Sequence, residues 1–296
     1  MTTAIAPTGV LLGSFTPGTP EWEEARGGLC VTATEIAAVL GLSPWMSRFS
    51  LWHKKAGLPS PPFQQNPAME WGVRLEDAVA RKYADEHPEL TLHKTGTWRH
   101  ATREWQRATP DRLADDRLVE VKTSPWGDEW GPAGDPDSVP IHYACQAKWQ
   151  MDTLGYSRTD FAVLISGHDY REYTIWADED DAYVMRSAAE EFLADVRNNV
   201  RPSIDDSDAT YQTIRRQPEG LEDIDVDIPV EVAARYEVAQ MQAKAADTEL
   251  TGARSQVLDL IGTGKRAVSN DRRIAYRTVR NGQTHALMPY RQKDNT

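Results

Sequence analysis

Three charged side chains stand at a spacing that suits hydrolytic chemistry: Asp111, Glu120 and Lys122. Asp111 ends one expected short strand, and Glu120 and Lys122 lie two residues apart in the next. Because alternate residues of a strand share a face, the Glu120 and Lys122 side chains should project together. Val119 and Val121 should then pack on the opposite face. The pattern predicts two carboxylates and one ammonium group within one small site.

These residue types indicate a divalent-cation site. Carboxylate oxygens are hard ligands that suit Mg²⁺ or Mn²⁺. Lys122 can orient or deprotonate a water, or neutralise charge on a phosphorane-like transition state. The seven histidines are scattered and form no HExxH motif or pairing with cysteine, so no other metal site competes. The alternative is a surface ion pair, because an Asp…Glu-x-Lys pattern also arises by chance.

A helix expected over residues 67–86 brings one further carboxylate toward these strands. Glu76 lies at the edge of its apolar stripe, where a ligand can face inward. The stripe consists of Trp71, Leu75, Val79 and Tyr83. His87 and Pro88 end the helix, because a residue before proline avoids helical backbone.

A second helix, expected over residues 140–154, carries polar side chains on one face. Pro140 suits its start and Gly155 its end. Tyr143, Gln146 and Gln150 share the face with Ala147 and Leu154. Polar residues there are unusual for simple core packing. The alternative is that they lie at the rim with their aliphatic stems packed.

The remaining elements predict an α/β or α+β core of about 200 residues, by the usual sizes of domains. A capping box, Thr32 to Glu35, predicts a helix that begins at Thr32. Another helix is expected over residues 179–199. Short strands are expected over residues 90–94, 97–99, 105–109, 117–122, 161–165 and 171–176, the last two forming a hairpin.

The domain organisation expected from the sequence has three parts. Residues 1–20 hold three prolines and three glycines without a period, and predict a flexible tail. Residues 21–204 form the core domain. Residues 205–296 form an extension with an acidic linker, one long helix and a basic hairpin or tail. Its residues 265–293 hold eight Lys and Arg against one Asp, which could hold duplex phosphates, dock a partner or merely offset the acidic linker.

Composition excludes several protein classes. The chain has 296 residues, a formal net charge of −12, 40% hydrophobic residues and 26% charged residues, which excludes a wholly disordered or fibrous protein. The acidic balance argues against nucleic-acid binding through bulk charge, although a basic groove or a metal can bind DNA locally. No segment approaches the roughly 18 apolar residues of a membrane helix, and no signal peptide is expected. Two cysteines indicate a reducing cytoplasm.

Five ordered motifs resemble the YqaJ-like viral recombinase family, relatives of phage lambda exonuclease among the PD-(D/E)XK nucleases. They cover about residues 22–176. The motifs are Arg26 with Val31 to Glu35, Glu70 to Gly72 with Glu76, Thr109 to Asp111, Glu120 to Lys122, and Tyr143 to Met151. The resemblance implies a restriction-endonuclease-like core, a central mixed sheet flanked by helices, with a helical C-terminal extension.

The resemblance also implies a Mg²⁺-dependent 5′→3′ double-strand DNA exonuclease, with Mn²⁺ as a substitute. The implied metal ligands are Glu76, Asp111, Glu120 and the Val121 carbonyl. Lys122 is the implied catalytic lysine, and Gln146 and Tyr143 complete the site.

Three residues are implied to hold the 5′-terminal phosphate: Arg26, Thr34 and Thr109. Thr34 is expected in the first turn of a helix, where free N–H groups attract an anion. The interval from Arg26 to Thr34 is one residue longer than the family pattern, with Gly27 and Gly28 in between. The alternative for Arg26 is a solvent-facing side chain after an acidic run.

The implied partners are double-stranded DNA ends and a RecT- or Bet-like single-strand annealing protein, in the cytoplasm of a bacterial host. A ring-like homotrimer is implied, without membrane association. Two alternatives stay open: an endonuclease or RecB-type single-strand nuclease of the same core, and a DNA-end-binding recombination scaffold that does not cleave. The intact Asp, Glu and Lys set speaks against the scaffold.

Overall fold

The structure is a computed structural model that describes residues 6–61, 66–216 and 220–290. The chain divides into two compact units, Met1–Gly220 and Leu221–Thr296. The boundary expected from the sequence lies after residue 204. The observed division lies later in the chain, because helix α7 (Asp208–Ile214) packs on the larger unit. Its Thr210 and Thr213 hydroxyls lie 2.7 and 2.8 Å from those of Ser47 and Ser50.

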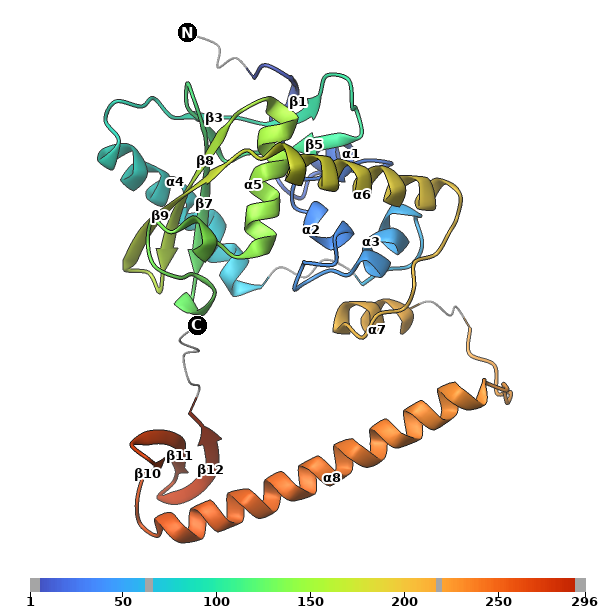
Figure 1. The fold of residues 1–296 in the computed structure, drawn as a ribbon, viewed down its shortest axis with the longest axis vertical. Helices are drawn as coiled ribbons and strands as arrows, with labels where there is room; N and C mark the ends of the chain where they lie inside the picture. Colours follow the sequence, from blue (N-terminus) through green and yellow to red (C-terminus); the bar gives the residue numbers. More distant parts are fainter. Residues whose placement is uncertain (1–5, 62–65, 217–219, 291–296) are drawn as a thin grey trace. The chain divides into compact units, whose positions relative to one another are not determined.

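Two β-sheets form the centre of the larger unit (Figure 1). The first contains, in spatial order, β1 (Gly9–Gly13), β4 (Thr97–His100), β5 (Gln106–Ala108) and β2 (Val31–Thr32). The second contains β3 (His93–Lys94), β6 (Arg112–Leu113), β7 (Leu118–Ser124), β8 (Arg158–Ile165) and β9 (Asp169–Trp176). Strands β7 and β8 are parallel and the other pairs of the second sheet are antiparallel, so this sheet is mixed.

Helices cover the second sheet on both faces, which confirms the predicted α/β core (Figure 1). On one face, α4 (Pro67–Glu86) buries Val79 and Tyr83 against Val119 and Val121. On the other, α5 (Ile141–Leu154) packs against both sheets and against α6 (Glu179–Arg197). The remaining α-helices of this unit are α1 (Pro20–Arg26), α2 (Ile36–Val39) and α3 (Arg48–Lys55).

The expected ends of the two long helices are confirmed. Helix α4 begins after Asn66, whose side chain accepts a hydrogen bond from the Met69 N–H. Helix α5 ends at Gly155, whose φ of 82° is a left-handed conformation that favours glycine.

Three expectations about local structure are wrong. Residues 9–13, expected in a flexible tail, form strand β1, because their backbone pairs with β4. The helix expected from Thr32 begins only at Ile36, after a strand and a turn. The Thr32 N–H does donate to Glu35 Oε2, at 3.1 Å, as in a capping box. Trp71, expected in the buried stripe of α4, is 60% exposed because this end of the helix extends beyond the packed core.

The smaller unit consists of α8 (Val230–Ile261) and a three-stranded antiparallel sheet. The sheet contains β10 (Arg266–Ser269), β11 (Arg272–Arg280) and β12 (Gln283–Pro289). The expected long helix and basic hairpin are therefore present, with a third strand, and Arg291 and Lys293 lie outside the described residues. In the described part of the chain, no helix is long and apolar enough to cross a membrane.

Asp160 of β8 anchors α4 to the sheet. Its buried carboxylate accepts hydrogen bonds from the Tyr83 hydroxyl of α4 at 2.5 Å and from the Arg117 guanidinium at 3.1 Å. Arg158 and Thr174 donate to it as well. Burial disfavours the charged carboxylate, but the hydrogen bonds from Arg158 and Tyr83 outweigh burial and lower the pKa of Asp160.

We expect Asp160→Asn to lower the free energy of unfolding by about 3 kcal/mol at neutral pH, because it leaves partly buried guanidinium groups without their counter-charge. A group with a lowered folded pKa stabilises above its unfolded pKa, and that contribution disappears as the pH falls through the folded value. The difference between the variant and wild type in urea unfolding should therefore shrink below about pH 4. Asp116→Asn is the control, since Asp116 also pairs with Arg117 but is 61% exposed.

Candidate active site

Strand β7 and helix α5 place the predicted catalytic side chains together. Glu120 and Lys122 face α5, opposite to Val119 and Val121, as the alternation predicts. The Gln146 amide of α5 bridges them: its Nε2 donates to Glu120 Oε1 at 2.7 Å, and its Oε1 accepts from Lys122 Nζ at 3.2 Å. Lys122 Nζ also lies 3.5 Å from Glu120 Oε1. The interpretation of this pair as a simple surface ion pair is wrong, because Glu120 is 1% exposed.

Asp111 joins this group through the backbone of β7. Its Oδ2 accepts a hydrogen bond from the Val121 N–H at 2.8 Å, at the residue between Glu120 and Lys122. Burial and the negative charge of Glu120 raise the pKa of Asp111 well above its ordinary value. Burial also raises the pKa of Glu120, although Lys122 and Gln150 partly oppose the shift. The site therefore concentrates negative charge in a desolvated place.

Lys122 is the cation of the site. Burial disfavours its ammonium, but Glu120 and Asp111 outweigh burial and raise the pKa of Lys122. Its Nζ lies 4.9 Å from the centre of the Tyr143 ring. Lys122 is consequently protonated at neutral pH. Its roles in orienting or deprotonating a water and in balancing negative charge stay predictions.

Glu76 is held to one side of these groups. Its Oε1 accepts from Arg112 at 2.7 Å, and the same guanidinium donates to the Asp111 carbonyl at 2.6 Å. The Glu76 charge still contributes to the raised pKa values of Asp111 and Glu120. Among the residues described, no three His, Cys, Asp or Glu side chains converge as a preformed metal site. Glu76 thus acts electrostatically on Asp111 and Glu120, but its side chain is paired with Arg112.

The three residues expected to hold a phosphate form one cluster. The Arg26 guanidinium donates to Thr34 Oγ1 at 2.8 Å and to Thr109 Oγ1 at 3.2 Å. The guanidinium also lies 4.6 Å from the centre of the Trp22 ring. Arg26 is therefore not the solvent-facing side chain of the alternative interpretation. Thr34 was expected in the first turn of a helix, and this expectation is wrong. The residue lies in the turn that precedes α2.

Several neighbours of this cluster were not predicted. Thr97 and Thr32 place their hydroxyls 3.1 and 3.2 Å from those of Thr109 and Thr34. Lys55 Nζ lies 2.8 Å from the buried Glu35 carboxylate, which holds the turn that carries Thr34. Lys55 has no local sequence signal for this contact, because α3 meets the turn only through tertiary packing.

An aromatic wall adjoins Lys122 and Tyr143. His142 lies edge-on to Trp45, with 4.6 Å between ring centres, and 4.1 Å from the Tyr143 ring. Burial and the charge of Lys122 lower the pKa of His142 to about 4, so that this ring is neutral at neutral pH. The Trp45 side chain is 63% exposed and presents an aromatic surface beside the site. The sequence carried no motif that identified Trp45 or His142.

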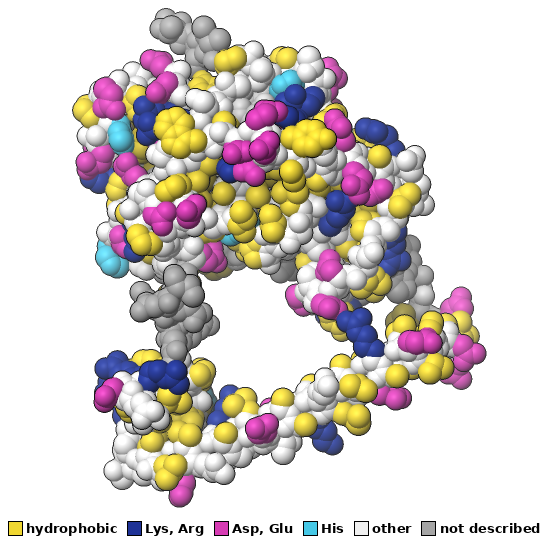
Figure 2. Space-filling model, in the orientation of Figure 1, with side chains coloured by type: hydrophobic (Ala, Val, Ile, Leu, Met, Phe, Trp, Pro, Cys, Tyr) yellow, Lys and Arg dark blue, Asp and Glu magenta, His cyan; other side chains and the backbone are white. Residues whose placement is uncertain are grey.

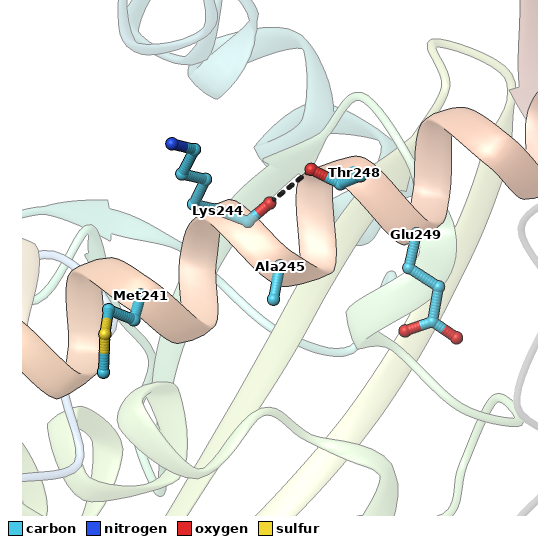
Figure 3. Close-up of a pocket in the computed structure, with 5 residues that line it drawn as sticks. All are labelled: Met241, Lys244, Ala245, Thr248 and Glu249. Carbon is cyan, nitrogen blue, oxygen red and sulfur yellow. Dashed lines mark hydrogen bonds between the residues drawn. The ribbon is translucent and has the colours of Figure 1, made fainter.

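The smaller unit has a separate shallow hollow on α8. Figure 3 shows Met241, Ala245 and Glu249 along one side of the helix there, and Lys244 and Thr248 along another. The Thr248 hydroxyl donates to the Lys244 carbonyl, an ordinary contact within a helix. None of these residues belongs to the charged groups described above, and the candidate active site is that of β7 and α5.

The YqaJ-like viral recombinase domain matches residues 21–184 of this sequence. The chain belongs to that family. The resemblance expected from the five motifs is thereby confirmed. The protein YqaJ of Bacillus subtilis (strain 168) is 27% identical over 205 residues, which cover 67% of this chain and 62% of that protein. The match spans less than two thirds of the Bacillus protein.

Two solved nuclease structures are also similar to this member of the YqaJ-like family. One is LHK-Exo, an alkaline exonuclease from Laribacter hongkongensis, in complex with dAMP: 22% identity, 61% of this chain, 94% of that chain, TM-score 0.49. The other is a phage-related exonuclease from Haemophilus somnus 129PT: 16% identity, 57% of this chain, 96% of that chain, TM-score 0.42.

The charge repulsion in the site predicts a stability effect. Without divalent cations, we expect Asp111→Asn to raise the melting temperature at about pH 8, because the variant lacks a half-buried charge that lies beside Glu120 and whose folded pKa is raised. A raised folded pKa favours folding at low pH and that contribution is lost as the pH rises, so the gain should shrink toward about pH 4. Each 1 kcal/mol corresponds to about 2–4 °C.

Differential scanning calorimetry in chelator measures this effect. Asp115→Asn, an exposed neighbour, is the control and should leave the melting temperature unchanged. A lower melting temperature for Asp111→Asn would show that the Asp111 carboxylate stabilises the fold and would contradict the assignment of repulsion.

Proposed function

We propose that this protein is a metal-dependent 5′→3′ double-strand DNA exonuclease of phage-type recombination. One observation carries the proposal: the Arg26 cluster and the buried acidic site are joined by the segment Thr109-Pro110-Asp111. Thr109 contacts Arg26, and Asp111 contacts β7 between Glu120 and Lys122. An anion pocket that adjoins a hydrolytic site suits an enzyme that begins at a phosphorylated end.

The chemistry of the donor groups fits Mg²⁺, with Mn²⁺ as a substitute. The charge of Glu120 raises the pKa of Asp111, a repulsion that a cation would relieve, and buried Gln150 Oε1 has no hydrogen-bond partner among the described residues. In this proposal Asp111, Glu120 and the Val121 carbonyl hold the ion, with Glu76 as an auxiliary ligand. The bound ion would polarise the scissile phosphate and lower the pKa of an attacking water.

Lys122 and its neighbours supply the remaining chemistry. The Lys122 ammonium balances the charge that develops on the phosphate oxygens, in a desolvated place where such a contact is strong. Gln146 holds the lysine and Glu120 in register through one amide. The Tyr143 ring lies beside the ammonium, with its centre 4.9 Å from Lys122 Nζ, and adds a cation–π contact.

The Arg26 cluster supplies selection of the 5′ end. A terminal phosphate carries more negative charge than an internal diester. The Arg26 guanidinium offers a fork of donors, and the hydroxyls of Thr34 and Thr109 are already within its reach. The pocket therefore favours the end of a strand over its interior.

Partners and assembly complete the proposal. Digestion of one strand leaves a 3′ single strand, the substrate of a RecT- or Bet-like annealing protein in the bacterial cytoplasm. A homotrimeric ring around the duplex would keep the enzyme on its substrate. Membership in a viral recombinase family supports the pathway, and light scattering tests the trimer.

Glu120→Gln and Lys122→Ala separate metal binding from charge balance. Both variants should lose activity on linear duplex by orders of magnitude, because each lacks a group that acts at the reacting phosphate. The melting temperature of wild type and of Lys122→Ala should rise with added Mg²⁺, whereas that of Glu120→Gln should rise much less. Full activity of Glu120→Gln would contradict the site, and loss of the Mg²⁺ effect in Lys122→Ala would make Lys122 structural.

Arg26→Ala tests the end pocket. We expect this variant to digest 5′-phosphorylated duplex about ten- to a hundredfold more slowly, because a charge-assisted contact contributes about 1.5–3 kcal/mol. Its preference for 5′-phosphate over 5′-hydroxyl ends should shrink as well. Arg197→Ala, an exposed arginine of α6, is the matched control and should behave as wild type.

The assay uses end-labelled linear, nicked-circular, closed-circular and single-stranded DNA, with Mg²⁺ or EDTA. Wild-type cleavage of closed circles would favour the endonuclease alternative, and preference for single strands the RecB-type one. Binding of ends without any cleavage would favour the scaffold.

A further inference from the structure

The three-stranded sheet of the smaller unit is strongly basic, although the whole chain is acidic. Between residues 265 and 290 there is one carboxylate, Asp271, and no glutamate. The basic residues of this stretch are Lys265, Arg266, Arg272, Arg273, Arg277 and Arg280. Figure 2 shows dark blue side chains gathered over β10–β12. The local charge is therefore opposite to the net charge of −12.

These cations are not neutralised within the described residues. None of the ion pairs there involves any of the six. By contrast, nine arginines of the larger unit pair with carboxylates: Arg48, Arg74, Arg99, Arg103, Arg112, Arg117, Arg158, Arg171 and Arg186. Unpaired guanidinium groups gathered on one small sheet suit an anionic partner.

The strand register sorts these side chains between two faces. Ala275 and Leu287 are buried on the inner face, where Arg277 donates to the Gly262 carbonyl at the end of α8. Directly paired residues share a face, so Arg266 and Tyr276 lie together on the outer face. A bulge between Ala267 and Val268 in the β10–β11 register brings Arg273 to this outer face.

Contacts of the side chains agree with this register. Arg273 donates to the Tyr290 hydroxyl at 3.3 Å and lies 5.5 Å from the centre of its ring. Tyr290 packs edge-on against Tyr276, with 5.3 Å between ring centres. Arg280 follows Tyr276 by four residues on the same strand and therefore extends the same face. We name this surface, formed by Arg266, Arg273, Tyr276, Arg280 and Tyr290, the outer basic face.

We propose that the outer basic face binds the phosphodiester backbone of DNA without sequence preference. A guanidinium fork matches phosphate oxygens, and tyrosine rings between arginines offer surfaces for sugars and bases. Exposed Arg266, Arg273 and Arg280 are the anchors, and Lys265 and Arg272 flank them. The proposal is independent of catalysis, because it concerns affinity in the absence of divalent cations.

The test compares full-length variants by fluorescence anisotropy in EDTA, with a short labelled single strand and the matching duplex. The test variant carries Arg266→Gln, Arg273→Gln and Arg280→Gln. Each lost phosphate contact should reduce the slope of log affinity against log salt by about 0.9 for duplex or about 0.7 for a single strand. We expect affinity to fall about tenfold or more at about 0.1 M salt. The DNA, single-stranded or duplex, for which the glutamine variant loses more affinity is the preferred ligand of this face.

Two controls make the result specific. The control variant carries Arg197→Gln, Lys244→Gln and Arg254→Gln, the same change of charge on α6 and α8, and should bind as wild type. Replacing the three arginines of the outer basic face by lysine keeps the charge and should retain most of the salt slope, which excludes misfolding as the cause. An unchanged affinity in the glutamine variant, or an equal loss in the control variant, would overturn the proposal.

Discussion

The hydrogen bond from the Val121 N–H to the Asp111 carboxylate is the contact on which the candidate active site depends. It fixes the start of β6 against the middle of β7, at the peptide between Glu120 and Lys122. Because side chains alternate along a strand, Glu120 and Lys122 then point toward α5. The amides of Gln146 and Gln150 donate hydrogen bonds to Glu120 there. A displacement of this contact would separate the two carboxylates and also move Thr109, two residues before Asp111.

The same arrangement is electrostatically unfavourable in the absence of a partner. Glu120 is buried and Asp111 is half-buried, and Lys122 alone faces these two carboxylates, because Arg112 pairs with the nearby Glu76. Proteins commonly tolerate such local repulsion at functional sites and compensate for it elsewhere. Here the compensation comes from the apolar core around β7 and β8 and from the Asp160 network, which holds α4 on the sheet.

The two units of the chain use their charges in opposite ways. In the larger unit, arginines are commonly paired with carboxylates, and the cations of the two candidate pockets, Arg26 and Lys122, contact hydroxyl, amide and carboxylate groups. In the smaller unit, arginines line one sheet without such partners. This division suits a protein in which chemistry and additional substrate affinity belong to different modules, with the acidic segment after Gly220 between them.

The sequence by itself determined many of the elements, among them α4, α5 and α8, and much of the candidate site. Alternation in a strand depends only on local backbone geometry, so that the common face of Glu120 and Lys122 could be predicted, as could the ends of α4 and α5. The motifs also identified Arg26, Thr34 and Thr109, which the fold brings within hydrogen-bond distance of one another.

Only the tertiary structure decided contacts between segments far apart in the sequence. No local sequence signal predicts the ion pair of Glu76 with Arg112 or the ion pair of Lys55 with Glu35. The same holds for the contact between the Trp45 and His142 rings. Strand β1 was missed for the same reason, because its pairing with β4 and not its own composition makes it a strand. Short-range order follows from neighbouring residues, whereas these contacts arise from the packing of distant elements, which a single sequence does not specify locally.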